Sequence, residues 1–252
     1  MASLSTSPHP AEADARLSFE GETSTPRLSI VMPVLDEASG ITAAIESARR
    51  AAPGAEILVA DGGSTDATAA IAAGIADRVI AARRGRARQM NDGAASAAGT
   101  ALLFLHADTR LPEDAGRLVL AALDDGADWG RFDVTIEGEP PILRLVAAMM
   151  NRRSRLTGVS TGDQAIFVAR RAFEAEGGFP DIPLMEDVAL SKRLRRLSRP
   201  ACLAARVSTS GRRWEANGPL RTIATMWALR LAYWCGAHPA RLAAVYGRLK
   251  SR

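Results

Sequence analysis

Carboxylate side chains occur at three places where an apolar run ends and a loop or helix begins. Asp61 and Asp108 each follow a short apolar run, and Glu186 and Asp187 open a helical pattern further along the chain. In open α/β sheets, ligands bind outside the carboxyl ends of the strands. A packed core does not require carboxylates at such positions, so the pattern indicates an enzyme that handles phosphate groups with the help of a metal ion.

Alternating apolar and amphipathic segments predict the elements that must position these side chains. We expect strands at residues 28–34, 56–60, 78–82 and 101–105, and helices at 37–52, 66–73, 86–98 and 112–123. Repeated strand–helix units of this size predict an α/β fold with a mostly parallel sheet flanked by helices. The pattern then loosens: an antiparallel or edge strand at 129–137, a strand at 165–169, and helices at 141–153 and 186–197.

The chain divides into three parts by composition. Residues 1–26 are rich in Ser, Thr, Pro and Glu and lack the apolar stretch of a signal peptide, so they predict a disordered leader. Residues 27–216 form the α/β domain. Residues 217–252 form a helical tail in which two amphipathic helices at 219–250 are broken near Gly236 and Pro239. The apolar run in the first of these helices contains Arg230 and is too short to span a bilayer.

Basic residues are concentrated at the C-terminal end. Residues 186–252 hold 14 basic and three acidic residues, whereas the whole chain has a net charge of +4. An anionic neighbour is therefore expected, either a diphosphate or an acidic membrane surface. Nucleic acid fits this pattern least, because the basic residues form no surface with interleaved aromatics, and no nucleic acid is expected as a partner. Cys202 and Cys235 are too few for a disulfide framework and predict buried thiols in a cytoplasmic protein.

The chain lacks the glycine-rich motifs that bind dinucleotides or triphosphates. No G-x-G-x-x-G follows the first strand, which runs instead into Pro33-Val-Leu-Asp36-Glu37. Carboxylates here can accept hydrogen bonds from a ribose or a base, but they repel a diphosphate unless a metal ion stands between them. Arg86 lies at the start of a predicted helix, where a phosphate is favoured.

Several segments in register resemble a known enzyme family. IVMPVLDE, VADGGSTDAT and LFLHADT are similar to the nucleotide-sugar domain of family 2 glycosyltransferases, which have the GT-A fold, a Rossmann-like sheet. The segments at 85–99 and 162–167 resemble a bacterial subgroup associated with arsenosugar biosynthesis and diaponeurosporenoate glycosylation. The resemblance covers residues 27–235. It implies inverting transfer of a sugar from a UDP- or GDP-sugar to a small or lipid-like hydroxyl or carboxyl acceptor.

The resemblance also implies roles for individual residues. Donor contacts are expected from Pro33, Glu37, Asp61, Arg86 and Asp108. His106-Ala-Asp108 takes the place of the family's Asp-x-Asp, so a divalent cation, Mn²⁺ or Mg²⁺, is expected at Asp108 with His106. Asp187 is expected to be the general base. The acceptor side is expected to include Gly162, Asp163, Gln164, Glu186 and Trp214.

Two other functions fit parts of the pattern. A nucleotidyltransferase also uses carboxylates at strand ends with a metal ion. A non-catalytic nucleotide-sugar-binding protein would use the basic tail, residues 219–250, as a peripheral contact with the inner face of the membrane. The apolar stripe of that tail also fits packing on the core or a homodimer contact. Several site residues have plain structural readings too: Asp61-Gly-Gly as a turn, and Glu186 and Asp187 as favourable charges at a helix N-terminus.

Overall fold

The protein is built around one eight-stranded mixed sheet. The computed structural model describes residues 26–250, so the predicted leader falls almost wholly outside the described residues. In the order β3-β2-β1-β4-β7-β6-β8-β5, the strands form a continuous sheet. Their bounds are β1 Leu28–Val34, β2 Glu56–Asp61, β3 Arg78–Ala81, β4 Ala101–Phe104, β5 Thr109–Arg110, β6 Trp129–Ile136, β7 Phe167–Ala169 and β8 Ala201–Thr209.

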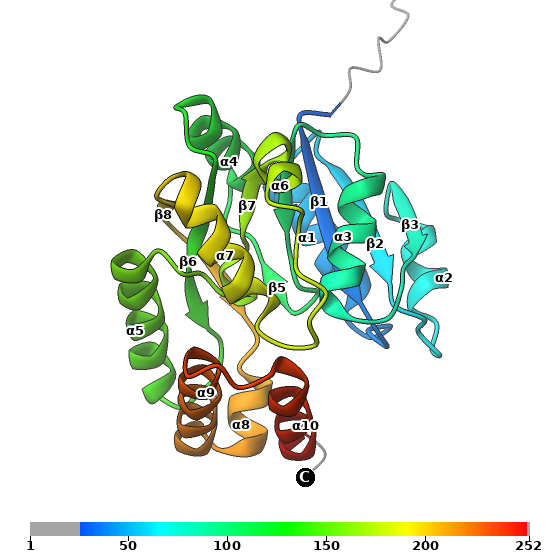
Figure 1. Ribbon diagram of the computed structural model, residues 1–252. Coiled ribbons are helices and arrows are strands. Elements are labelled where there is room, and N and C mark those ends of the chain that lie inside the picture. The colour runs from blue at the N-terminus through cyan, green and yellow to red at the C-terminus, as the bar shows by residue number, and fades with distance from the viewer. Residues whose placement is uncertain (1–25, 251–252) are drawn as a thin grey trace, which may run out of the picture.

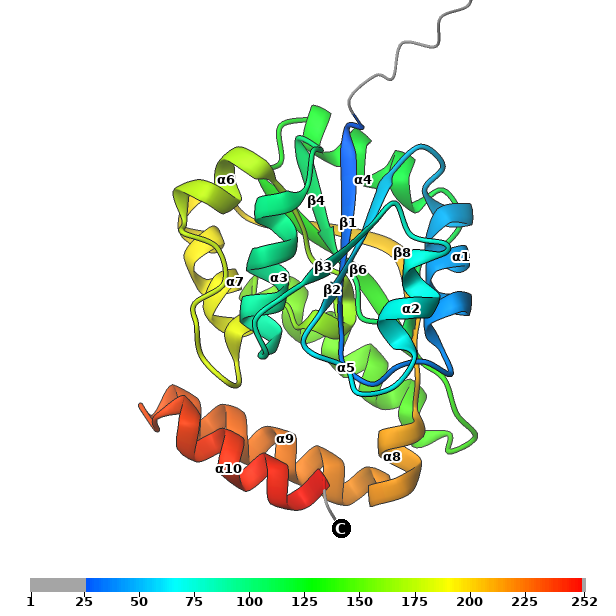
Figure 2. The same cartoon turned by 90° about the vertical axis from the view of Figure 1, so that its right-hand side faces the viewer.

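Ten α-helices and one short 3₁₀-helix are present in residues 26–250. The α-helices are α1 Ile41–Ala51, α2 Thr68–Ala73, α3 Arg86–Ser96, α4 Ala115–Asp124, α5 Ile142–Thr157, α6 Arg170–Ala175, α7 Glu186–Leu197, α8 Arg212–Asn217, α9 Pro219–Trp234 and α10 Pro239–Lys250. The 3₁₀-helix, η1, spans Gly162–Gln164. Helices cover both faces of the sheet, and α8, α9 and α10 lie together at one end of it (Figure 1, Figure 2).

Strand direction places the loops after β1, β2 and β4 and the turn before β7 at the same edge of the sheet. β1 pairs in parallel with β2 and β4, whereas β7 is antiparallel to both β4 and β6. The chain therefore leaves β1, β2 and β4 at the edge where it enters β7. The turn before β7 consequently lies beside the loop after β4. Helices α8, α9 and α10 lie across this edge (Figure 1).

Apolar side chains on each face of the sheet form a separate core. Ile30 and Met32 of β1 pack with Ile41 and Ile45 of α1 on one face. Val31, on the other face of β1, packs in the cluster that includes α3 and α7. This alternation along β1 buries both faces of a central strand, which explains why its sequence is almost continuously apolar.

The parallel half of the sheet agrees with the sequence expectation, but three helices start two or more residues later than predicted. Helix α4 begins at Ala115, after Asp114 with a left-handed φ of 59°. Helix α1 begins at Ile41 because Asp36 has a left-handed φ of 54° and a turn follows it, in which the Glu37 carbonyl accepts from Gly40 N and Ile41 N. Helix α2 begins at Thr68, since the Asp66 carboxylate accepts Thr68 N at 2.9 Å and holds the preceding residues in a turn.

The prediction of an antiparallel or edge strand at 129–137 is only partly right. β6 lies inside the sheet, antiparallel to β7 and parallel to β8. Only Thr135 of its residues is not buried. Neither β8 nor α6 was expected from the sequence.

The cysteines and the tail helices add two findings. Cys202 is only partly buried and Cys235 is exposed, so the expectation of two buried thiols is wrong; both are free.

Among residues 26–250, none of the helices combines the length and the apolar character that crossing a bilayer requires.

Close packing of α3 on the sheet gives a test of the fold. A Cβ built on Gly93 would lie 2.4 Å from Val31 Cγ1, whereas one built on Gly247 of α10 meets nothing within 4 Å. We expect Gly93→Ala to lower the free energy of unfolding by about 1–3 kcal/mol through overpacking. Gly247→Ala should leave it unchanged or raise it by up to about 1 kcal/mol, since alanine favours the helix. Urea unfolding measures both; equal effects would contradict the close approach.

Candidate active site

The ends of β1 and β2 are held together by a buried glutamine that the sequence did not single out. Gln89 Nε2 of α3 donates to Val34 O at 2.6 Å and to Ala60 O at 3.0 Å. The register places Val34 of β1 opposite Asp61 of β2. Gln89 thus satisfies backbone carbonyls at the edge where the strands end, and it fixes the position from which the Asp61 loop starts.

Asp61 is buried, and its carboxylate accepts hydrogen bonds from its own loop. Gly63 N donates to Oδ2 at 3.2 Å and Ser64 N donates to the same oxygen at 3.1 Å. The Ser64 hydroxyl donates to Oδ1. A carboxylate has about four acceptor sites, so three donors leave room for one more. The turn that Asp-Gly-Gly favours is therefore present, and a further contact to a ligand is compatible with it.

His106 and Asp108 follow β4 and face the turn before β7. His106 Nδ1 lies 3.6 Å from Asp163 Oδ1. A Cβ on Gly162 would lie 2.4 Å from His106 Cε1, so only glycine lets the imidazole approach this closely. Antiparallel β7 explains the contact, because it brings residues 162–163 back to the edge where β4 ends.

Asp187 lies at the N-terminus of α7 and is tied to the same turn. Gly162 N donates to Asp187 Oδ2 at 2.8 Å, and Val188 N donates to Oδ1 at 2.6 Å. Met185, the residue before the first residue of α7, has a left-handed φ of 71°. A non-glycine residue in that region costs about 1–3 kcal/mol, and such strain is concentrated at functional sites. The strain here orients the start of α7 and with it the carboxylate.

Glu186 differs from its neighbour by being buried. Its side chain is 4% exposed, and Arg86 Nη1 lies 3.6 Å from its Oε1. Burial, and then repulsion from Asp187, raises the pKa of Glu186 above its usual value, and attraction to Arg86 only partly offsets this rise. Adjacent acids in one helix turn thus have different environments: Asp187 is hydrogen bonded and partly open, and Glu186 is enclosed.

The residues that follow β4, the turn before β7 and the start of α7 line one pocket of about 200 Å³. The predicted site residues found in its wall are Pro33, Glu37, Arg86, His106, Asp108, Gly162, Asp163, Glu186 and Asp187. Three predicted residues are not in this wall. Asp61 is hydrogen bonded within the turn that follows β2. Gln164, the last residue of η1, is fully buried and donates to Ser154. Trp214 packs in an apolar cluster with Leu143 and Ile223.

The tail helices supply part of the pocket that the sequence did not predict. Met226, Leu229 and Arg230 of α9 and Tyr246 of α10 line it together with the strand-end residues. Leu229 is buried in a cluster with Val188 and Met185 at the start of α7. The amphipathic pattern of α9 was the available signal, but it did not tell which surface the apolar stripe covers.

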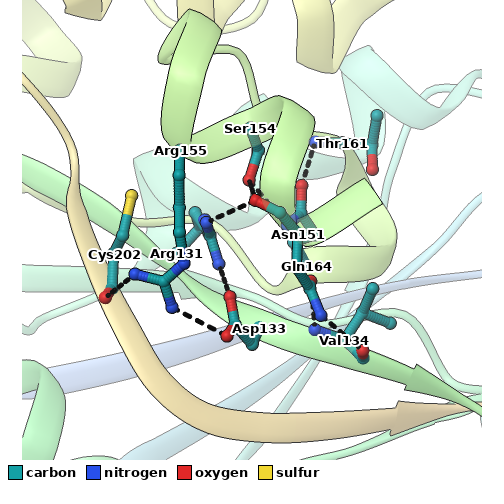
Figure 3. Close-up of polar contacts among 9 residues, drawn as sticks. All are labelled: Arg131, Asp133, Val134, Asn151, Ser154, Arg155, Thr161, Gln164 and Cys202. Carbon is teal, nitrogen blue, oxygen red and sulfur yellow. Dashed lines mark hydrogen bonds and ion pairs between the residues drawn. The ribbon is translucent and has the colours of Figure 1, made fainter. Parts of the chain in front are cut away.

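A buried polar network supports the turn from below (Figure 3). Gln164 Nε2 donates to Ser154 Oγ of α5 at 3.0 Å. Asn151 of the same helix exchanges two hydrogen bonds with the backbone of Val134 in β6, at 2.8 and 3.0 Å. Arg131, which is fully buried, pairs with Asp133. The network therefore fixes α5 against β6 and the 161–164 turn against α5.

The residues present fit a metal ion that is shared with a ligand. Among residues 26–250, no group of three or more His, Cys, Asp and Glu side chains is arranged to hold a metal by itself. Asp108 and His106 nevertheless face the pocket with Asp163 beside them. Mg²⁺ and similar cations are often bound by one or two carboxylates, with phosphate oxygens and water completing the shell. Asp108 fits such a role.

The curled, mostly parallel sheet, flanked by helices and bearing carboxylates at its carboxyl edge, defines the GT-A fold. Residues 29–173, more than half of the chain, match the family described as Glycosyl transferase family 2. The chain belongs to this family. No curated protein matches the sequence.

Solved structures share the fold at low sequence identity. TarS 1-349 of S. aureus in complex with UDP aligns with a TM-score of 0.57 and 17% identity, over 73% of this chain and 60% of that one. The mannosyltransferase PcManGT from Pyrobaculum calidifontis, in complex with GDP-Man and Mn²⁺, gives 0.54 and 20%, over 74% and 57%. Glucosyl-3-phosphoglycerate synthase from Mycobacterium tuberculosis, with Mn²⁺, UDP and glucosyl-3-phosphoglycerate, gives 0.53 and 19%, over 81% and 77%.

Burial of Glu186 predicts how stability depends on pH. A folded-state pKa above the ordinary 4.5 means that the carboxyl contributes its full stabilisation below that value and loses it as the pH rises through the folded-state pKa. Glu186→Gln removes this dependence, so the variant should become more stable relative to the wild type between pH 4 and pH 7. Urea unfolding at several pH values measures the difference.

The exposed Glu46→Gln, on α1, is the control for loss of one carboxylate. A Glu186→Gln variant that instead becomes less stable relative to the wild type as the pH rises would show that Glu186 is stabilised as a carboxylate.

Proposed function

We propose that the protein is an inverting, metal-dependent glycosyltransferase that moves a hexose-like sugar from a UDP- or GDP-sugar to a small or lipid-like acceptor with a hydroxyl or carboxyl group. One observation carries this proposal. Asp187, anchored by Gly162 N at 2.8 Å, lines the same pocket as Asp108. A candidate base therefore faces a candidate metal ligand across a space that a sugar can occupy.

The nucleoside is assigned to the ends of β1 and β2. Pro33 and Glu37 line the pocket, and Asp61 lies beside β1 in the sheet. A carboxylate with spare acceptor capacity can bind a base N–H or a ribose hydroxyl. UDP and GDP-Man occur in the structures of TarS and PcManGT, respectively, and this supports a nucleoside diphosphate as the donor's leaving group.

The diphosphate is assigned to Asp108, His106 and Arg86. Arg86 is half exposed at the first turn of α3, where both its charge and the helix N-terminus favour an anion. A divalent cation at Asp108, Mn²⁺ or Mg²⁺, would neutralise the charge that develops on the leaving diphosphate. Mn²⁺ in the structures of PcManGT and glucosyl-3-phosphoglycerate synthase supports this assignment.

Asp187 is assigned as the base. A hydroxyl of the acceptor loses its proton to the Asp187 carboxylate as its oxygen attacks the anomeric carbon. The bond between that carbon and the diphosphate oxygen breaks, and its electron pair leaves with the nucleoside diphosphate. Single displacement from the opposite face inverts the anomeric centre. A carboxylate acceptor would attack without transferring a proton.

The acceptor side is assigned to Gly162, Asp163 and Glu186, which line the pocket around Asp187. Gln164 and Trp214 are assigned a supporting role, because the first holds the turn on α5 and the second packs beneath α9. The subgroup suggested by residues 85–99 and 162–167, the cytoplasmic location, a peripheral membrane contact through 219–250 and a homodimer stay predictions. A non-catalytic nucleotide-sugar-binding protein is the alternative that the next experiment separates.

Removing the base should abolish transfer and spare donor binding. We expect Asp187→Asn to lower kcat by about 10²–10⁴-fold, the usual contribution of general base catalysis. Calorimetry should find the affinity for the nucleotide sugar unchanged. Asp181→Asn, on the exposed loop before α7, is the matched control and should keep full activity. Unchanged turnover in Asp187→Asn would remove the base assignment and favour a protein that only binds its ligand.

Chelation should stop the reaction reversibly. EDTA should abolish transfer because the diphosphate leaving group loses its counter-charge. Added Mn²⁺ or Mg²⁺ should restore it, and Asp108→Asn should require more metal for half-maximal rate. Full activity in the chelator would contradict the role given to Asp108 and leave the family assignment intact.

A further inference from the structure

Helix α5 contacts α9 (Figure 1). Two adjoining grooves lie along this contact, beyond the catalytic pocket, and α7 contributes to the wall of the larger one. Their volumes are about 600 and 330 Å³, within the range of small-molecule sites. Large apolar side chains line the larger groove while remaining open to solvent: Leu156 is 76% exposed, Trp227 58%, Leu231 62% and Trp234 79%. A concentrated apolar surface of this kind marks a binding site.

The charged groups in the groove walls are all cations. Arg153, Lys192, Arg195 and Arg230 contribute to the lining, and no Asp or Glu does so among the described residues. Lys192 Nζ already lies 5.1 Å from the centre of the Tyr233 ring. A purely apolar ligand would gain nothing from four cations, so the occupant that complements the groove is apolar along its length and negatively charged.

Arg153 identifies where the negative charge belongs. Its Nε and Nη2 atoms are buried, and neither has a hydrogen-bond partner within residues 26–250. Burial, and then repulsion from Arg230, lowers the pKa of Arg153 to about 10, while Asp187 acts in the opposite direction. The guanidinium group thus lies close to a second cation with donors unused, an arrangement that a carboxylate or phosphate would satisfy.

The grooves and the catalytic pocket share a wall. Arg230 lines all three spaces, and Val188, next to Asp187, lines both the larger groove and the pocket. A molecule whose charged end lies between Arg153 and Arg230 therefore has that end beside the catalytic pocket and its apolar part along α9.

We propose that the groove between α5 and α9 binds one anionic amphiphile, with its long apolar chain over Trp227 and Trp234 and its carboxylate or phosphate group between Arg153 and Arg230. That this molecule is the sugar acceptor rests on the function proposed above. A membrane surface is a poorer match, because lipid headgroups in a bilayer reach exposed side chains but not the buried donors of Arg153. A second copy of the chain would need carboxylates to oppose these cations.

Quenching of tryptophan fluorescence tests the site directly. A fatty acid with a nitroxide on its chain, used below its critical micelle concentration, should quench the wild type and should quench the Trp227→Phe/Trp234→Phe variant much less. Its methyl ester should bind at least about tenfold more weakly, because hydrogen bonds to a charged group contribute this order of affinity. Competition by laurate and by dodecyl phosphate then identifies which anionic group is preferred.

Matched arginine variants locate the charge. Arg153→Gln and Arg230→Gln should each weaken binding of the labelled fatty acid at least about tenfold, with unchanged thermal unfolding. Arg144→Gln, an exposed arginine of α5 outside both grooves, should have no effect. Equal binding of the ester, or equal binding by Arg153→Gln, would overturn the proposal.

Donor binding separates this inference from the proposed function. Calorimetry with the nucleotide sugar should give the same affinity in Arg153→Gln as in the wild type. If the donor binds but the fatty acid does not, the inference fails and the function stands. Loss of donor binding in Arg153→Gln would mean that the cations serve the diphosphate. Tight binding to vesicles with 30% anionic lipid, combined with no binding of the monomeric fatty acid, would assign the groove to a membrane surface instead.

Discussion

The hydrogen bond from Gly162 N to Asp187 Oδ2 joins the two sides of the pocket, and the other features of the site depend on it. It holds the turn before β7 against the first turn of α7. Since the same glycine lies directly under the His106 ring, one residue sets the distance between the candidate base and the candidate metal ligands. The position of Asp187 thus depends on the turn before β7 as well as on α7, and the position of His106 depends on the same turn as well as on β4.

The polar network beneath that turn contains a buried ion pair whose residues do not line the pocket. Arg131 is fully buried, and its pairing with Asp133 avoids the cost of an isolated charge. Asn151 ties α5 to β6 through two backbone hydrogen bonds (Figure 3). An apolar interface would permit sliding between a helix and a strand, whereas these directional bonds fix one position. Because Gln164 ties the 161–164 turn to α5, the position of α5 also fixes the position of this turn.

The sequence predicted which residues follow β1, β2 and β4 at the sheet edge, and only part of the rest of the pocket wall. Residues after β1, β2 and β4 could be identified because an apolar run followed by Asp, Gly or His is a local pattern. β8 was missed because most of its residues are only partly buried and include Arg206, so no strict alternation is visible. The walls supplied by Arg230 and Tyr246 could not be predicted, since an amphipathic stripe does not say what it packs against. The sequence shows Arg153 only as one of several arginines at the end of a predicted helix, and it does not show that its guanidinium group is partly buried.

The attachment of the tail helices has a consequence for how such a protein diversifies. α9 contacts the α/β domain through two small apolar clusters, one around Leu229 and Val188 and one in which Ile223 packs with Leu143 of α5, while the sheet and its two cores are complete without it. The exposed side chains of α9 that line only the outer groove, Leu231 and Trp234, are therefore separate from the strand-end carboxylates. Substitutions at these positions can alter which molecules fit the groove and leave the chemistry of the sheet edge intact, so selectivity and reactivity can change independently of each other.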